Sequence, residues 1–222
     1  MPYRYTPCVT SETYHVFNRS IAGQIIFKTT NDYQRMYNLL EYYRFQSLTN
    51  SFSHYNRLPT KAKEMYMSQI KTTKPLHGTL LAFAIMPTHI HLVMRQEQEG
   101  GISTFMSCIQ NGYAKYFNIC HKRSGAMFQS MYKKVLLESE EQYLHTIRYV
   151  HLNPMTSNIV SSEKELSEYP WTSLPDYLNN NSTSFINTSW ISHTFKSLDS
   201  FRRFTFDQAE YQRSLKLMKQ FD

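Results

Sequence analysis

Cysteine and long apolar runs are scarce in this sequence. Its 222 residues include three cysteines, Cys8, Cys108 and Cys120, and no C-x-x-C pair. A disulfide scaffold or a cysteine-based zinc site is therefore not expected, and a reducing compartment is favoured. The longest apolar run, Leu80–Met86, is too short to cross a bilayer of about 30 Å, and the first ten residues lack the apolar core of a signal peptide. We expect a cytoplasmic protein without a membrane partner.

Apolar, aromatic and basic residues are abundant. Hydrophobic residues make up 41% of the chain and aromatic residues 15%, including 17 Tyr and 14 Phe, which is enough for a packed core and argues against disorder. The 24 Lys and Arg residues exceed the 17 Asp and Glu residues, so the net charge is +7. Such an excess agrees with a polyanionic partner such as nucleic acid, but many basic proteins bind none.

Segments with strand and helix patterns alternate along the chain. Two strand-like runs are joined by the tight turn Pro87-Thr88, which predicts an antiparallel pair. A capping box at Ser139-Glu140-Glu141-Gln142 predicts the start of a helix that should end at Pro154. The predicted strands are 14–18, 24–27, 76–86, 89–95 and 135–137, and the predicted helices are 31–48, 102–121 and 139–154. This order favours an α+β fold with an antiparallel sheet and helices on one face.

The chain is predicted to contain one domain with an appendage. Residues 1–177 would form the domain, and residues 178–222 a linker and a C-terminal helical extension, because 179–184 is a polar, linker-like tract. Within the domain, 49–75 is a basic insertion with five cations and the single acid Glu64. It can be interpreted as a solvated loop with a short helix or as a flap that faces DNA.

Two histidines form the first candidate site. Side chains alternate between the two faces of a strand, so His89 and His91 point the same way, and Ile90 and Leu92 point to the other face. Two adjacent imidazoles on a rigid strand can chelate a divalent ion. The alternative is a pair of ordinary surface histidines. The apolar flanks and the preceding turn favour a site.

A stripe on the last predicted helix forms the second candidate site. At about 100° per residue, Ile147 and Val150 share a face that should pack on the sheet. His145, Tyr149 and Asn153 lie four residues apart on a different stripe. The alternative is a boundary tyrosine followed by an asparagine that caps the helix before the next proline.

Five motifs together resemble the REP-associated tyrosine transposases. This family belongs to the single-tyrosine HUH superfamily, in which U is a bulky apolar residue. The matches follow the family order from about residue 12 to residue 177. They are Tyr14-His15-Val16-Phe17-Asn18-Arg19, Met86-Pro87-Thr88-His89-Ile90-His91, Phe128-Gln129-Ser130-Met131-Tyr132-Lys133, Arg148-Tyr149-Val150-His151-Leu152-Asn153-Pro154 and Tyr169-Pro170-Trp171-Thr172-Ser173.

The resemblance implies a ferredoxin-like fold with the histidine strand at the middle of the sheet and the tyrosine helix beside it. It implies that His89, His91 and Asn153 are metal ligands and that Tyr149 is the nucleophile. The phenol must be deprotonated, and the base is left open; His145, one turn away, is the candidate for support. The resemblance implies Mg²⁺ or Mn²⁺ as the metal, although the same ligands alone would suit Zn²⁺ at least as well.

The resemblance also implies an activity and a partner. The enzyme would nick and rejoin single-stranded or hairpin DNA through a 5′-phosphotyrosine, in the cytoplasm and associated with the nucleoid. A homodimer and a monomer are both open. Basic residues are expected to neutralise the DNA backbone, and the candidates are Arg19, Lys115, Lys122, Arg123, Lys133 and Lys134.

Some positions differ from the family pattern. Thr88 stands where the family usually has Asn, Ser130-Met131 where it tends to have Gly-Arg, and Thr156 and Asn158 where Arg and Gly are common. None of these changes removes a proposed catalytic group.

Two other functions stay open. The first alternative is a catalytically silent nucleic-acid-binding module on the same fold. The second is a histidine-ligated metallohydrolase of small phosphoesters in which Tyr149 is structural.

Overall fold

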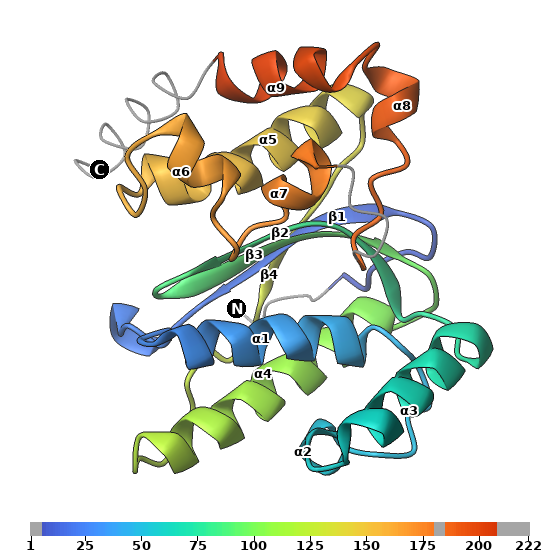
Figure 1. The fold of residues 1–222 in the computed structure, drawn as a ribbon, viewed down its shortest axis with the longest axis vertical. Coiled ribbons are helices and arrows are strands. Elements are labelled where there is room, and N and C mark those ends of the chain that lie inside the picture. The colour runs from blue at the N-terminus through green and yellow to red at the C-terminus, as the bar shows by residue number, and fades with distance from the viewer. Residues whose placement is uncertain (1–5, 180–184, 208–222) are drawn as a thin grey trace.

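A four-stranded antiparallel sheet forms the centre of the protein (Figure 1). The computed structural model describes residues 6–179 and 185–207. The strand order is β2-β3-β1-β4, so β3 lies inside the sheet with a partner on each side. The expected α+β class is confirmed. The strands are β1 (Thr13–Arg19), β2 (Gly78–Met86), β3 (His89–Gln96) and β4 (Lys133–Leu136).

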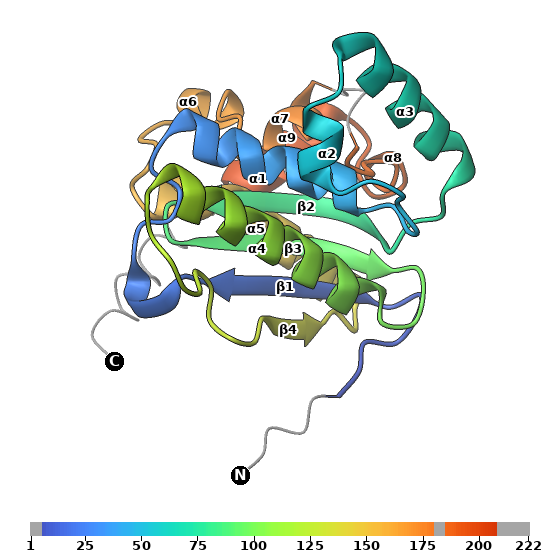
Figure 2. The same ribbon diagram turned by 90° about the horizontal axis from the view of Figure 1, so that it is seen from below.

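Helices cover both faces of this sheet (Figures 1 and 2). On one face lie α1 (Thr30–Tyr43), α2 (Phe52–Asn56), α3 (Thr60–Thr73) and α4 (Gly101–Cys120). On the other face lie α5 (Glu140–Thr156), α6 (Glu163–Ser167), α7 (Leu174–Leu178), α8 (Ile191–Thr194) and α9 (Leu198–Phe206). A 3₁₀ turn, η1 (Ile21–Gly23), follows β1. Within the described ranges, no helix has the length and apolar composition that a membrane span requires.

The prediction of helices on one face only is wrong, and β2 shows why. Nearly every side chain of β2 is buried, so this strand needs apolar cover on both sides. Leu80, Phe83 and Ile85 belong to the large core under α1 and α4. The other face of β2 belongs to a second apolar cluster that includes Ile147 and Val150 of α5. The predicted inward face of α5 is thus confirmed, but it packs on the face of the sheet opposite α1.

Residues 24–27, predicted as a strand, form an irregular segment. The backbone N–H groups of Ile26 and Phe27 both donate to the carbonyl of Pro87, at 2.8 and 3.1 Å. Both side chains are fully buried. The apolar composition of this segment therefore serves packing against the β2–β3 turn, and its hydrogen bonds go to that turn and not to a neighbouring strand.

The helix carrying Tyr149 ends two residues later than predicted, at Thr156, with Pro154 inside it. Proline removes one N–H from the helix ladder, which costs little in the last turn because the N–H of Ser157 still donates to the carbonyl of Asn153 at 3.0 Å. Asn158, at a position where Gly is common in the resembling family, has φ of 55°. Asparagine adopts this left-handed conformation more readily than most other non-glycine residues.

The basic insertion 49–75 is largely helical and packed. It forms α2 and α3, on the α1 and α4 side of the sheet (Figure 2). Tyr42 of α1 is buried among the rings of Phe52, Tyr55 and Tyr66, and its hydroxyl donates to the carbonyl of Asn50 at 2.7 Å. The aromatic residues of the insertion therefore anchor it to α1, and it is more ordered than the predicted loop with a short helix.

The described part of the C-terminal region packs on α5. Phe201 and Phe206 of α9 are buried, and the guanidinium of Arg148 donates to the carbonyl of Phe204 at 3.2 Å. The predicted boundary at residue 177 falls within α7. Most of the linker-like tract, and the part of the predicted helical extension from 208 to 222, lie outside the described residues.

The start of α1 gives a testable prediction about acid stability. The Asp32 carboxylate is 1% exposed and accepts hydrogen bonds from the N–H groups of Lys28 and Thr29, both at 3.0 Å, and from His121 Nε2 at 3.2 Å. Burial acts to raise its pKa, but the bonds from His121 and the backbone outweigh burial and hold the pKa below its usual range. The carboxylate therefore stabilises the fold above pH about 4, and this contribution is lost as the pH falls through the folded-state pKa.

We expect Asp32→Asn to lower the free energy of unfolding at pH 7 by about 1–3 kcal/mol, because an amide N–H₂ would face N–H donors. The gap in melting temperature between the wild type and Asp32→Asn should narrow as the pH is lowered from 7 to about 3. Thermal unfolding followed by circular dichroism measures both values. A gap that is independent of pH would contradict the prediction.

Candidate active site

The two histidines of β3 lie side by side on the face of the sheet that α5 covers. The ring centroids of His89 and His91 are 4.9 Å apart. His91 is buried, and His89 is half-buried. Ile90 and Leu92 point to the other face, into the core under α1 and α4. The alternation predicted for this strand is therefore present.

Tyr149 of α5 lies against the buried histidine. Its ring meets the His91 ring edge-on, with centroids 5.6 Å apart and planes at 89°. The side chain is 37% exposed, so the phenol is open to solvent while its neighbours Arg148 and Val150 are buried. The expectation that the tyrosine helix lies beside the histidine strand agrees with this arrangement.

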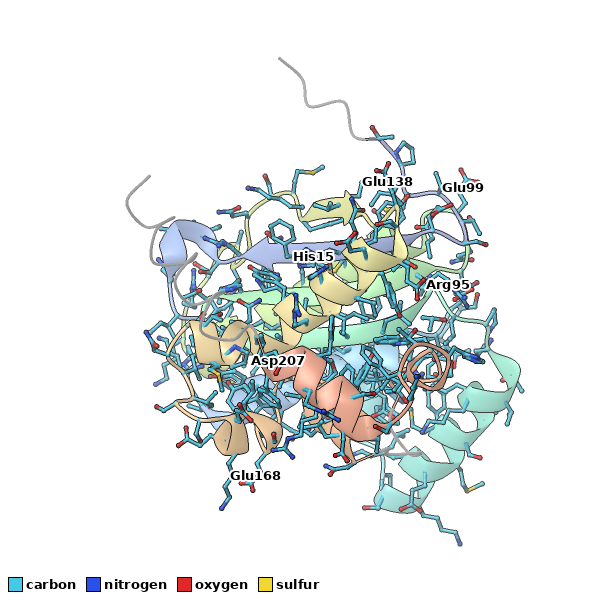
Figure 3. All side chains as sticks on the ribbon, turned by 90° about the horizontal axis from the view of Figure 1, so that it is seen from above. His15, Arg95, Glu99, Glu138, Glu168 and Asp207 are labelled. Atoms are coloured by element: carbon cyan, nitrogen blue, oxygen red, sulfur yellow. The ribbon has the colours of Figure 1, made fainter. Side chains whose placement is uncertain are left out.

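His15 of β1 adds a third ring beside His91 and Tyr149, a contact that was not predicted from the sequence. A hydrogen bond of 2.9 Å joins His15 Nε2 and His91 Nδ1. Burial lowers the pKa of His15 to about 4, so its ring is neutral at physiological pH. The ring also meets the edge of Tyr149, with centroids 5.9 Å apart. Figure 3 shows His15 on β1 beside α5.

The ring nitrogens of the histidine pair are oriented by neighbours. The Nδ1 atom of His89 is hydrogen bonded to the hydroxyl of Thr88 at 2.9 Å, and the Nδ1 atom of His91 is bonded to His15. A metal would therefore bind the Nε2 atom of each ring, with the Nδ1 contacts holding the rings in place, as is usual for metal-binding histidines. Thr88, which stands where the resembling family has Asn, supplies one of these contacts.

Asn153 lies one turn after Tyr149 and is fully buried. Its Nδ2 donates to the carbonyl of Tyr149 at 3.3 Å, so Oδ1 is the amide atom that a metal would meet. Among the described residues, no group of three His, Cys, Asp or Glu side chains could hold a metal, so a site here needs this amide. Two imidazoles and an amide oxygen fit Mn²⁺ or Zn²⁺, and they fit Mg²⁺ less well because it prefers oxygen ligands.

His145 lies one turn before Tyr149 and is exposed. Its Nδ1 accepts a hydrogen bond from the guanidinium of Arg148, and its Nε2 is 3.7 Å from the Glu141 carboxylate. With Nδ1 as acceptor, a neutral ring carries its proton on Nε2. His145 therefore lies in the predicted place, but its basic nitrogen is occupied by Arg148.

One cavity is lined by Tyr149, and a second cavity shares Phe17 with it. The first, of ≈ 520 Å³, lies between α5 and the edge of the sheet. The second, of ≈ 300 Å³, lies farther along β1. The first is lined by His15, Phe17, Val135, Leu137, Gln142, His145, Thr146 and Tyr149. The second is lined by Phe17, Asn18, Arg19, Gln129 and Lys133.

The predicted DNA-binding cations divide between the two sides of the sheet. Arg19 and Lys133 line the second cavity, and Arg19 is paired in register with His89. Lys134 extends the other way, where its ammonium donates to the carbonyl of Thr6 and lies 5.7 Å from the centre of the Tyr14 ring. Lys115 is on α4, on the far face.

Lys122 and Arg123 lie in the loop after α4. The guanidinium of Arg123 donates to the Met127 sulfur at 2.9 Å and to the Gln24 side chain at 3.4 Å, so it braces this loop. Of the six candidates, only Arg19 and Lys133 therefore line a cavity that shares a residue, Phe17, with the cavity of Tyr149.

A buried pair joins the tyrosine helix to the sheet. His151 Nε2 lies 2.9 Å from the hydroxyl of Ser173, and that hydroxyl accepts from the N–H of Phe83 in β2 at 2.9 Å. Burial lowers the pKa of His151 to about 3, so it stays neutral. Neither His151 nor Ser173 was predicted as a site residue. Two of the five motifs, those around Tyr149 and Trp171, meet at this contact and fix α5 on β2.

Comparisons with known proteins support the fold. No protein-family model matches the sequence, and no curated protein has a matching sequence. Among solved structures, the chain is similar to a REP-associated tyrosine transposase bound to a REP hairpin. The sequence identity is 13% and the TM-score 0.53, over 85% of this chain and 91% of that one. The similarity shows that the two chains share a fold.

Proposed function

We propose that this protein is a metal-dependent nuclease and ligase of single-stranded DNA, of the transposase type, with Tyr149 as its nucleophile. The observation that carries the proposal is the position of Tyr149, exposed and 5.6 Å from the ring of His91. An exposed phenol beside paired imidazoles is what attack on a metal-bound phosphate requires. The shared fold with a transposase bound to a DNA hairpin supports it.

His89 and His91, through Nε2, and Asn153, through Oδ1, would hold a divalent ion, and of the two metals that the resemblance implies this ligand set favours Mn²⁺ over Mg²⁺. When bound, such an ion polarises the scissile phosphate as a Lewis acid. The Tyr149 oxygen attacks phosphorus, the bond from phosphorus to the 3′-oxygen breaks, and that oxygen takes up a proton as it leaves. The product is a 5′-phosphotyrosine, which a 3′-hydroxyl can attack to rejoin the strand.

The phenol must lose its proton for this attack. His145 can accept it at Nδ1 only after its hydrogen bond with Arg148 is broken. Since Tyr149 is exposed, water also has direct access to the phenol proton. The structure as it stands therefore favours transfer to solvent, with His145 as acceptor after a rearrangement of Arg148.

A binding assay over a range of salt concentrations tests the cations of the second cavity. Lys133→Ala should weaken binding of a labelled DNA hairpin and reduce the slope of log affinity against log salt by about 0.7, the value for one single-stranded phosphate contact. Lys115→Ala, on the far face of the sheet, is the matched control and should leave the slope nearly unchanged. Equal effects of both variants would show that binding does not use this cavity.

The experiment that tests the proposed function is a covalent adduct assay. Incubation of the protein with a labelled single-stranded hairpin and Mn²⁺ should give a protein–DNA adduct that survives denaturation. Salt-dependent binding with no cleavage would instead indicate a silent binding module. Turnover of a generic phosphodiester without an adduct would indicate a metallohydrolase.

A further inference from the structure

The cavity lined by Tyr149 and the cavity lined by Arg19 and Lys133 differ in chemistry and share the side chain of Phe17. The floor of the larger cavity is apolar, with Phe17, Val135 and Leu137 among its lining residues. The smaller cavity is polar and carries the cations Arg19 and Lys133. Phe17 is half-buried and lines both. A mainly apolar cavity and a positively charged one therefore lie on either side of one side chain, Phe17.

Phe17 also belongs to a cluster of three rings whose planes are inclined by 30° or less. Its centroid is 4.9 Å from that of His15 and 5.5 Å from that of His91, with planes inclined by 30° and 26°. The rings of His15 and His91 are inclined by 18°. The centroids of His15 and His91 are 5.1 Å apart, so the three rings form a compact cluster, and Phe17 is the member that also lines the cavity with the cations.

The occupant that fits these two cavities has a flat, weakly polar ring attached to an anion. Val135 is 52% exposed in the larger cavity, so apolar surface there is open to solvent with no cover from the described chain. The adjoining cations are both exposed, so they are free of steric cover and can pair with a negative group. A nucleotide meets both demands, because its base has an aromatic face and its phosphate a negative charge.

We propose that Phe17 is the stacking platform for the base of a nucleotide next to the scissile phosphate, and that the adjoining phosphate of this nucleotide lies between Arg19 and Lys133. The inference rests on the proposed function, since Tyr149 lines the same cavity. Stacking of this kind tolerates any base, because every base has a π-face. The site would hold the strand at a fixed distance from Tyr149 without selecting its sequence.

The test is a binding measurement in EDTA, where no cleavage interferes. The probe is a fluorescein-labelled DNA hairpin with single-stranded flanks of mixed sequence, and the dissociation constant is read by fluorescence anisotropy. Phe17→Leu should weaken binding about 5- to 100-fold, and Phe17→Tyr should bind within about twofold of the wild type, since it keeps the ring. Tyr116→Leu, on the far face of the sheet, is the control for loss of an aromatic side chain and should bind normally.

A second set of probes locates the base. Flank nucleotides are replaced one at a time by abasic residues. One abasic position should weaken wild-type binding by the same factor as Phe17→Leu and have no further effect on that variant, because the two changes remove the same contact. The inference would be overturned if Phe17→Leu bound the hairpin with wild-type affinity. It would also be overturned if the effect of an abasic position added in full to the effect of Phe17→Leu. Melting temperatures of the variants check that the fold is intact.

The outcomes for stacking and for cleavage can be told apart. Coupling between Phe17 and one base, with no adduct in Mn²⁺, would keep the stacking site and overturn the nuclease. An adduct without coupling would overturn the stacking site alone. Failure of the wild type to bind any probe would overturn both.

Discussion

Tyr149→Phe is expected to abolish formation of the protein–DNA adduct and to reduce cleavage to background, by at least about a thousandfold. Phenylalanine keeps the edge contacts of this ring with His15 and His91 but has no oxygen to attack phosphorus. Because Tyr149 is 37% exposed, the substitution removes no buried hydrogen bond, and the melting temperature should change little.

The substrate label decides what this experiment can show. A 5′-phosphotyrosine leaves the 3′ part of the strand on the protein, so a label at the 3′ end should move with the protein in a denaturing gel and a label at the 5′ end should not. Tyr143→Phe is the matched control, since Tyr143 is on the same helix but packs against the second apolar cluster. An adduct formed by Tyr149→Phe at the wild-type rate would mean that another residue is the nucleophile.

His89→Ala is expected to abolish cleavage and to weaken Mn²⁺ binding by more than the 10- to 100-fold that is typical of loss of an outer-shell contact. DNA binding in EDTA should stay within about twofold of the wild type, because backbone affinity comes mainly from cations. His89 is the better choice of the two histidines, since it is half-buried and its removal leaves the bond between His15 and His91 in place.

Isothermal titration with Mn²⁺ in the absence of DNA measures the metal affinity directly. His54→Ala, an exposed histidine on α2, is the control and should bind Mn²⁺ and cleave DNA as the wild type does. If His89→Ala cleaved normally, the histidine pair would not be part of the cleavage machinery, and the ligand assignment would fail whatever the role of Tyr149.

Local periodicity made the centre of the candidate site predictable. The two-residue period of a strand places His89 and His91 on one face, and the helical period places Tyr149 on the stripe of Asn153. Neither inference needs to know how distant segments pair. The structure agrees with both, with rings 4.9 Å apart on the strand and the tyrosine beside them.

Contacts that depend on strand pairing were not predictable in this way. His15 meets His91 because β1 and β3 pair in a register that sets Phe17 opposite His91, and a partner 76 positions away leaves no local pattern. The cations show the same limit. Lys133 and Lys134 look like one basic cluster in the sequence, but strand alternation sends them to opposite faces, and only Lys133 lines a cavity beside the site.

The position of β4 has a mechanical consequence for the larger cavity. One wall of the cavity is α5, which is fixed to β2 through His151 and Ser173 and is covered by α9. The other wall includes Val135 of β4, a strand of four residues that pairs, within the described parts of the chain, with β1 alone. A strand that is hydrogen bonded along one edge is displaced more easily than a helix that packs against neighbours on two sides. The two walls therefore differ in stiffness, and a bulkier substrate would be accommodated by displacement of β4, with Tyr149 kept in position.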